Sequence, residues 1–120
     1  MEKKTLVIGA SLKTSRYSNM AIKKLRKHKV PTLALGLRKG VVEDVLIETE
    51  NLNFENVDTV TLYLNPKRQK EYYDYILALQ PERVIFNPGT ENPEFYEKLR
   101  KAGIEVLPAC TLVLLSTNQY

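Results

Sequence analysis

A loop of small and basic residues follows the first apolar run of the sequence. It spans residues 9–19, and Gly9 stands directly after the run 5–8. A glycine at this place lets the backbone turn tightly, and the free N–H groups at the start of the next helix attract an anion. The full three-glycine dinucleotide motif is absent, because Ser11 and Thr14 occupy the second and third glycine positions. The loop indicates phosphate binding, with a plain strand-to-helix turn as the alternative.

A second loop, residues 36–40, carries Arg38 and Lys39 between two glycines. NAD-binding proteins usually hold the ribose hydroxyls with an Asp or Glu at the end of the second strand. Two cations in place of that carboxylate disfavour NAD. They favour a ribose that bears an extra phosphate, as in NADP or coenzyme A. An exposed basic turn without a ligand is the alternative.

A third loop places Lys67 and Arg68 in the first turn of a helix that starts at Asn65-Pro66. The helix dipole is positive there and disfavours cations. A bound anion would offset this mismatch, and long side chains that extend into water would also relieve it. Three loops expected at one end of a sheet therefore point to an anionic ligand.

Residues that could perform acid–base or nucleophilic chemistry are few. His28 is the single histidine and lies in a lysine-rich helix, and Cys110 has no partner that the sequence identifies. Glu91 stands in a loop that faces the expected crevice, although a carboxylate at a helix start is common. No catalytic triad, metal-ligand cluster or pair of carboxylates is evident. We expect no catalytic residues and no metal, and the sequence favours a binding module over an enzyme.

The elements that position these loops alternate between short apolar runs and amphipathic stretches, which indicates a three-layer α/β Rossmann-like fold. We expect about five parallel strands with helices on both faces, and a ligand crevice at the carboxyl ends of the strands. The expected strands are 5–8, 30–35, 57–64, 83–86 and 104–107, and the expected helices start at Ser18, Asn65-Pro66 and Asn92-Pro93.

Three further features of the elements can be read from the sequence. The first helix is expected to run to about Lys27, with Ser18 as its cap and with Met20, Ala21 and Leu25 facing inward. Residues 41–49 predict a short edge strand or a hairpin. The apolar tail at 112–115 must dock, either as a strand or as a helical turn, on its own core or on a second copy.

Length and composition limit the possible classes of protein. The 120 residues suit one domain, with 43% hydrophobic and 27% charged residues. A lone cysteine suits a reducing compartment, and no signal peptide or membrane span is visible. A cytoplasmic location is therefore expected. The net charge of +4 permits an anionic partner. However, the basic run 23–29 contains no aromatic residue to stack a base, so we interpret it as a solvated helix face rather than a nucleic-acid site.

Several motifs resemble those of the small bacterial CoA-binding proteins, relatives of the CoA-binding domain in succinyl-CoA synthetase α-subunits. The opening 6–11 with 16–19, the proline-bearing second strand 30–33 and the glycine turn 36–40 all resemble this family. The stretch 86–92 and the closing segment 102–110 match it as well. The resemblance covers nearly the whole chain, except that 43–56 carries no matching motif and 111–120 is more apolar than the family's usual tail.

The resemblance implies a single domain over residues 1–120 that holds coenzyme A through its ADP moiety. Residues of the first loop would surround the pyrophosphate, those of the second would lie near the ribose phosphate and adenine, and 63–65 would line the nucleotide. The implied binding residues are Gly9, Ala10, Ser11, Lys13, Arg16, Ser18, Asn19, Gly36, Leu37, Arg38, Lys39, Tyr63, Leu64, Asn65 and Gly89. The larger catalytic relatives carry their active-site histidine on a further domain, so their ligase activity is not implied.

Three hypotheses follow. The first is a non-catalytic carrier, sensor or regulatory module that binds coenzyme A or an acyl-CoA, without nucleic acid or membrane as partner. The second is an NADP-dependent enzyme on the same fold. The third is a protein-interaction subunit that has kept the fold but lost its ligand. All three leave open a homodimer or an unknown protein partner.

Overall fold

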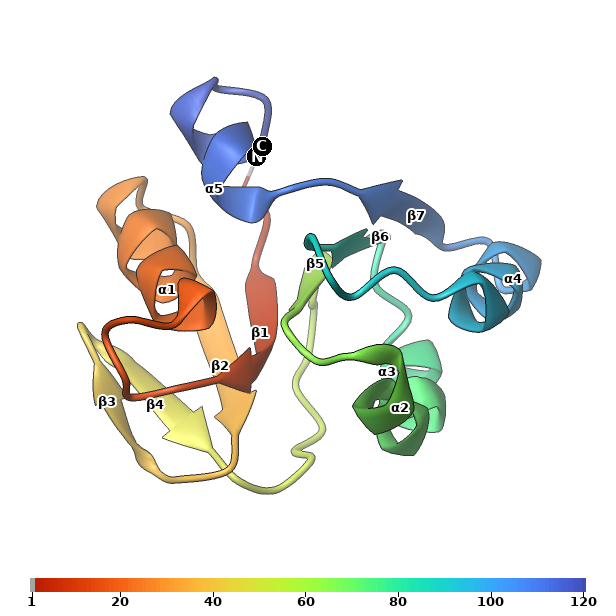
Figure 1. Ribbon diagram of the computed structural model, residues 1–120, viewed down its shortest axis with the longest axis horizontal. Helices are drawn as coiled ribbons and strands as arrows, with labels where there is room; N and C mark the ends of the chain where they lie inside the picture. Colours follow the sequence, from red (N-terminus) through yellow and green to blue (C-terminus); the bar gives the residue numbers. More distant parts are fainter. Residues whose placement is uncertain (1) are drawn as a thin grey trace.

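The computed structural model describes residues 2–120 as one seven-stranded sheet between two layers of helices (Figure 1). The strands are β1 (Thr5–Ala10), β2 (Thr32–Gly36), β3 (Gly40–Val42), β4 (Val45–Glu48), β5 (Thr59–Leu62), β6 (Arg83–Phe86) and β7 (Glu105–Pro108). The helices are α1 (Tyr17–Lys27), α2 (Pro66–Gln69), the 3-10 turn η1 (Lys70–Tyr72), α3 (Tyr73–Leu79), α4 (Pro93–Lys101) and α5 (Thr111–Ser116). No described helix is long and apolar enough to cross a membrane.

The spatial order of the strands is β3-β4-β2-β1-β5-β6-β7. All neighbours pair in parallel except β3 and β4, which form an antiparallel hairpin. From β1 the chain runs outward to β2 and β4, and it then returns to build β5, β6 and β7 on the other side of β1. The direction of strand order therefore reverses between β1 and β5. A parallel sheet binds its ligands at this point.

The expected fold class is confirmed, and the expected number of strands is corrected. Six strands run in parallel and one antiparallel strand lies at the edge, rather than about five parallel strands. The difference comes from residues 41–49. They form a hairpin, one of the two expected forms, but its second strand β4 pairs in parallel with β2 through Ala34 and Leu35. β4 has four residues and follows a two-residue turn, so its alternating positions are too few for the sequence to show that it is a strand of the parallel sheet.

Alternating strand residues fill two cores, one on each face of the sheet. Leu6, Ile8, Val60, Leu62, Val84 and Phe86 pack with Phe95 and Leu99 under α3 and α4. Val7, Ala34, Val45 and Ile47 pack with Ile22 and Leu25 of α1 and Leu115 of α5. Strands that are apolar on both sides are typical of a sheet covered on both faces. In Figure 1, α1 and α5 cover one face, and α2, α3 and α4 cover the other.

Two details of α1 differ from expectation. The helix starts two residues earlier than expected, so Arg16 rather than Ser18 is the N-cap residue, and Ser18 is buried in the first turn. Met20 is 39% exposed, whereas Ala21, Ile22 and Leu25 are buried. The inner stripe follows positions 18, 21, 22 and 25, and Met20 lies outside it because of the helical period.

The apolar tail docks as a helix, which decides between its two expected forms. Leu115 of α5 packs against α1, while Val113 stays exposed. Beyond α5 the chain reaches the amino ends of the strands, where the buried Arg83 donates from Nη2 to the Tyr120 carbonyl at 2.8 Å. The Arg83 guanidinium also lies 4.5 Å from the centre of the Tyr120 ring, in cation–π contact.

The start of α5 is fixed by a buried polar network centred on Asn87. The Asn87 side chain donates from Nδ2 to Thr61 Oγ1 at 2.6 Å and to the Leu62 carbonyl at 2.9 Å. Its Oδ1 accepts from the Thr111 amide at 2.9 Å, and the Thr61 and Thr111 hydroxyls share a hydrogen bond of 2.8 Å. This network joins β5, the loop after β6 and α5 directly behind the carboxyl ends of the strands.

Asn87→Ala is expected to destabilise the protein by about 3 kcal/mol. It leaves the Thr111 amide and the Leu62 carbonyl buried without this partner, and each such group costs roughly 1–3 kcal/mol. Urea unfolding followed by circular dichroism measures the change. Thr117→Ala, at an exposed position of the same tail, is the control and should stay within about 0.5 kcal/mol of the parent. Equal stability of the two variants would contradict the role given to the network.

Candidate functional site

A cavity of about 710 Å³ lies at the carboxyl ends of β1, β2, β5 and β6. Its volume is within the range of roughly 300–1,000 Å³ that is typical of small-molecule sites. It lies where the strand order reverses, and the four loops that the sequence assigned to a crevice build its walls. The lining residues are Gly9, Ala10, Ser11, Leu12, Lys13, Arg16, Tyr17, Ser18, Gly36, Leu37, Arg38, Tyr63, Leu64, Asn65, Arg68, Tyr72, Pro88, Gly89 and Thr90.

The first wall is the loop after β1, whose shape depends on Gly9. Gly9 has φ of +94°, a conformation that other residues rarely adopt. A Cβ atom there would lie 3.0 Å from the backbone carbonyl of Tyr63. Further along the loop, Ser11 Oγ accepts from the Lys13 amide at 3.1 Å, and the Ser11 carbonyl accepts from Asn19 Nδ2 at 3.0 Å. Asn19 therefore holds the loop from beneath.

The second wall begins at Gly36, where β2 ends beside β1. A Cβ atom on Gly36 would lie 2.4 Å from the carbonyl oxygen of Ala10. This approach is possible only for glycine and brings the loop with Arg38 next to the loop with Arg16. Leu12 of the first loop packs over Gly40, since a Cβ there would lie 2.5 Å from the Leu12 side chain. The first loop is thus seated on the edge hairpin.

The third and fourth walls are joined through buried amide side chains. Asn65 caps α2 by accepting the Arg68 amide at 3.0 Å, as the Asn-Pro pair predicted. Gln69 Nε2 donates to the carbonyls of Leu64 and Thr90, both at 2.8 Å. Asn92 Nδ2 in turn donates to Gln69 Oε1 at 2.9 Å and to the Tyr73 hydroxyl at 2.8 Å. These bonds fix the spacing between the loops after β5 and β6.

Four cations surround the cavity: Lys13, Arg16, Arg38 and Arg68. All four are exposed, and within residues 2–120 none of them forms an ion pair. No aspartate, glutamate, histidine or cysteine occurs among the lining residues of this described part of the chain. The site is therefore suited to a ligand with several negative charges. No cluster of metal-binding side chains is found in the same range.

Tyr63 lines the cavity, but its hydroxyl group lies in the interior beside Thr61 and Thr111. Its hydroxyl oxygen is buried without a hydrogen-bond partner in the described structure. Burial raises the pKa of this hydroxyl well above its usual value, although the hydroxyls of Thr111 and Thr61 nearby oppose the shift. The phenol therefore keeps its proton at neutral pH.

The structure brings together most of the binding residues expected from sequence. Asn19 and Lys39 do not line the cavity: Asn19 is buried below the first loop, and Lys39 lies 3.7 Å from Glu48. Sequence reasoning omitted Leu12, Tyr17, Arg68, Tyr72, Pro88 and Thr90 from the binding residues. For Arg68 a signal was present, namely a cation in the first turn of a helix.

The other groups considered for chemistry lie outside the cavity. His28 ends α1 and contacts the Lys24 carbonyl through Nδ1. Cys110 is half-buried as the N-cap residue of α5. The Glu91 carboxylate accepts the Gly89 amide at 2.8 Å, so it is held at the rim of the cavity by the loop itself.

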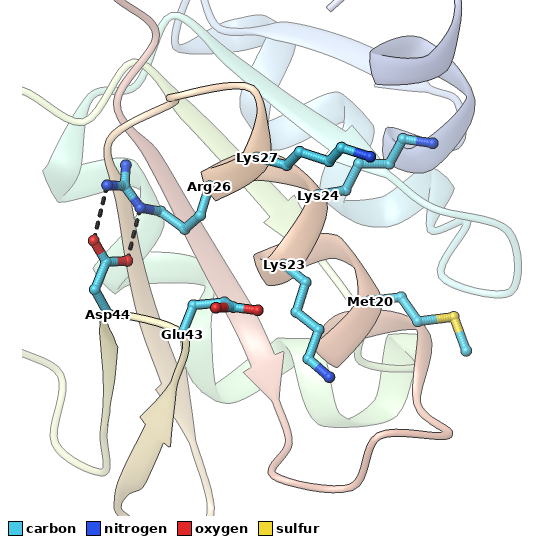
Figure 2. A pocket seen from close by; sticks show the side chains of 7 residues that line it. All are labelled: Met20, Lys23, Lys24, Arg26, Lys27, Glu43 and Asp44. Carbon is cyan, nitrogen blue, oxygen red and sulfur yellow. Dashed lines mark hydrogen bonds and ion pairs between the residues drawn. The ribbon is translucent and has the colours of Figure 1, made fainter.

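A second hollow, of about 790 Å³, lies on the outer side of α1 against the β3–β4 turn (Figure 2). Its residues are Met20, Lys23, Lys24, Arg26, Lys27, Glu43 and Asp44. Arg26 binds Asp44 through two hydrogen bonds of 2.8 and 2.9 Å, which hold the pKa of Asp44 below its usual value. Lysine ends in the last turn of α1 complement the helix dipole, in agreement with a solvated helix face.

Fold and site together define a Rossmann-type domain whose crevice is basic. The pattern of the CoA binding domain family matches residues 3–116, and the chain belongs to this family.

Solved structures show the same fold. An uncharacterized protein is 48% identical with a TM-score of 0.97, covering 100% of this chain and 99% of its own. A protein from Thermus thermophilus is 22% identical with a TM-score of 0.86, covering 99% of this chain and 91% of its own. A hypothetical protein from Pyrococcus horikoshii is 24% identical with a TM-score of 0.87, and the match covers 97% of this chain and 83% of that protein. A comparison with curated proteins found no match.

Gly36→Ala is expected to lower stability by about 1–3 kcal/mol, because the methyl group meets the Ala10 carbonyl and must push β1 and β2 apart. Thermal or urea unfolding measures this loss. Gly40→Ala is the matched control, since its methyl group meets only the movable end of Leu12. A Gly36→Ala protein no less stable than Gly40→Ala would show that the close approach of the two strands is not required.

Proposed function

We propose that this protein binds coenzyme A, or an acyl-CoA, through the ADP moiety at the crevice between β1 and β5. The observation that carries the proposal is the set of four unpaired cations around a cavity lined by no carboxylate in the described chain. Coenzyme A carries a pyrophosphate and a ribose phosphate, and its charge matches this set. Membership of the CoA binding domain family supports the same ligand.

The loops suggest how the ligand would be divided among them. Arg16 and the start of α1 stand where a Rossmann domain receives a pyrophosphate, because the helix N-terminus offers free N–H groups. Arg38 follows Gly36 at the end of β2, where an NAD-binding protein has its ribose-binding carboxylate. A cation at that place attracts the phosphate of a phosphorylated ribose, which a carboxylate would repel. NAD is the poorer fit for the same reason.

The proposed role is that of a carrier, sensor or regulatory module without chemistry of its own. The groups that line the described cavity are lysine, arginines, tyrosines and small or neutral residues. General acid–base catalysis needs a group whose pKa lies near the working pH. The burial that raises the pKa of Tyr63 moves that hydroxyl further from this range. An NADP-dependent enzyme is the second candidate, since the basic loop after β2 suits its 2′-phosphate equally well.

Isothermal titration calorimetry with CoA, dephospho-CoA, NADP and NAD separates these candidates. We expect CoA to bind roughly ten times more tightly than dephospho-CoA, because a charge-assisted phosphate contact contributes about 1.5–3 kcal/mol when well formed. NADP should bind more weakly than CoA, and NAD more weakly still. Tighter binding of NADP than of CoA would replace the proposal with its second candidate, and no response to any nucleotide would favour an interaction subunit.

Arg38→Ala is expected to remove the preference for CoA over dephospho-CoA while leaving the affinity for dephospho-CoA almost unchanged. The comparison forms a double-mutant cycle between the side chain and the ligand phosphate, so it isolates their interaction. Lys98→Ala removes an equal charge from the exposed side of α4 and is the control. An equal loss of affinity for both ligands would assign Arg38 to another part of the ligand.

A further inference from the structure

Of the two edges of the sheet, the outer edge of β3 is the one better suited to pair with another strand. β3 is the first strand in the spatial order and has β4 as its neighbour. At the opposite end of the sheet, β7 finishes at Pro108, which lacks an N–H group to donate. β3 contains no proline, and its sequence Gly-Val-Val suits a pleated strand. Such an edge is a template for β pairing with another chain.

The charges beside β3 are arranged symmetrically about Val41. Arg38 and Lys39 precede the strand, and Glu43 and Asp44 follow it. If a second β3 pairs antiparallel about a two-fold axis at Val41, residue 39 of one copy faces residue 43 of the other. Asp44, the second residue of the turn, leads back toward β4 and lies outside this register. Each copy therefore presents Lys39 to the partner's Glu43, twice in the dimer.

The unpaired backbone N–H and C=O groups of β3 point in the direction that this pairing requires. Val42 and Val45 close a two-residue turn, in which Glu43 has φ of +57°. The residues that close such a turn exchange hydrogen bonds with each other, and the next pair, Val41 and Leu46, does not. The N–H and C=O groups of Val41 therefore point away from β4, toward the outer edge. Two copies related at Val41 would exchange two hydrogen bonds there.

The side chains of the hairpin complete the match. Val41 is 61% exposed and Leu46, opposite it on β4, is 49% exposed, whereas Val42 and Val45 on the other face are buried. Pairing at Val41 would set Leu46, Val41 and their two symmetry mates in one apolar row across the joined sheets. On the other face, Gly40 would lie opposite the partner's Val42 position. The edge thus complements itself in shape as well as in charge.

From these four features we infer that the outer edge of β3 is a homodimer interface in which two sheets join antiparallel about Val41. A second copy is favoured over an unrelated protein because one two-fold axis at Val41 matches the opposite charges, the free backbone groups and the apolar side chains at the same time. Glu43 is exposed and forms no ion pair within residues 2–120 (Figure 2). Lys39 lies 3.7 Å from Glu48 and is likewise exposed.

The dimer is expected to be weak, because a three-residue strand buries little surface and small interfaces associate transiently. Sedimentation velocity over a concentration series should show half-association on the order of 100 μM. Lys39→Glu makes both contacts with residue 43 repulsive, and Glu43→Lys does the same from the other side. Each single variant is expected to raise the dissociation constant roughly tenfold. An equimolar mixture of the two restores attraction at both contacts and should form a heterodimer as tight as the parent.

A second experiment does not depend on charge. In a Cys110→Ser background, Val41→Cys places two thiols at the two-fold axis, where Cα atoms of a hydrogen-bonded antiparallel pair lie about 5.5 Å apart. A disulfide spans that distance, so mild oxidation should give a covalent dimer. Val113→Cys, on α5 and 55% exposed against 61% for Val41, is the control and should remain monomeric.

Three results would overturn the inference. One is a parent chain that stays monomeric up to about ten times the expected half-association concentration. Another is a mixture of the Lys39→Glu and Glu43→Lys proteins that associates no better than either alone. The third is a Val113→Cys protein that forms covalent dimers while Val41→Cys does not, which would place the contact at α5. Because neither Lys39 nor Glu43 lines the ligand cavity, these results are independent of coenzyme A binding.

Discussion

The close approach of backbones at the carboxyl ends of β1, β2 and β5 is the constraint on which the rest of the structure depends. Gly9 leaves room for the carbonyl of Tyr63, and Gly36 leaves room for that of Ala10. Where a side chain is missing, three strand ends can converge, and their loops can then share one cavity. Interiors are packed too tightly to absorb even a methyl group at such points without a shift of the chain. The cavity therefore depends first on these two glycines, which let the strand ends converge, and then on the cations around it.

Buried polar side chains keep the converged loops at a fixed spacing. Asn87 connects β5 to the start of α5, and Gln69 connects the loops after β5 and β6. Each amide is satisfied by partners on two different elements, so displacement of either element would leave a buried group unpaired. The cations differ in this respect, because they are exposed and without ion pairs in residues 2–120. The frame is rigid, whereas the charged side chains remain free to adjust to a ligand.

The sequence predicted the fold class because its apolar runs are separated by turns that contain Gly, Asn and Pro. Asn65-Pro66 and Asn92-Pro93 start helices where expected, and each Asn accepts the amide three residues later. The hairpin at 41–49 shows the limit: its strands are short, and the parallel pairing of β4 with β2 is a long-range property that no local pattern contains. Met20 is apolar but lies outside the inner stripe of α1, because the helical period places Ala21, Ile22 and Leu25 on the buried face instead.

The candidate site was predictable where the backbone determines it and less so where side chains do. Gly9, Gly36 and Asn65 follow directly from the strand ends and from turn chemistry. Lys39 neighbours Arg38 in the sequence, but the structure places its ammonium group 3.7 Å from Glu48 of β4 rather than in the cavity. Tyr72 and Thr90 were omitted because their place in the cavity depends on how α2 and the loop after β6 approach each other. That approach is set by Gln69, which has no signature in the sequence.

The hydrogen bond between the Glu91 carboxylate and the Gly89 amide has a consequence for ligand orientation. On the β6 side of the crevice, a backbone donor that could have received a phosphate is already occupied by an internal anion. No cation lines the described part of that side, whereas Lys13, Arg16 and Arg38 stand on the loops after β1 and β2. With Arg68 on α2 after β5, the positive charge therefore lies along the β2, β1 and β5 side of the crevice. A ligand with a charged head and an uncharged arm would meet cations toward β2 and neutral groups toward β6.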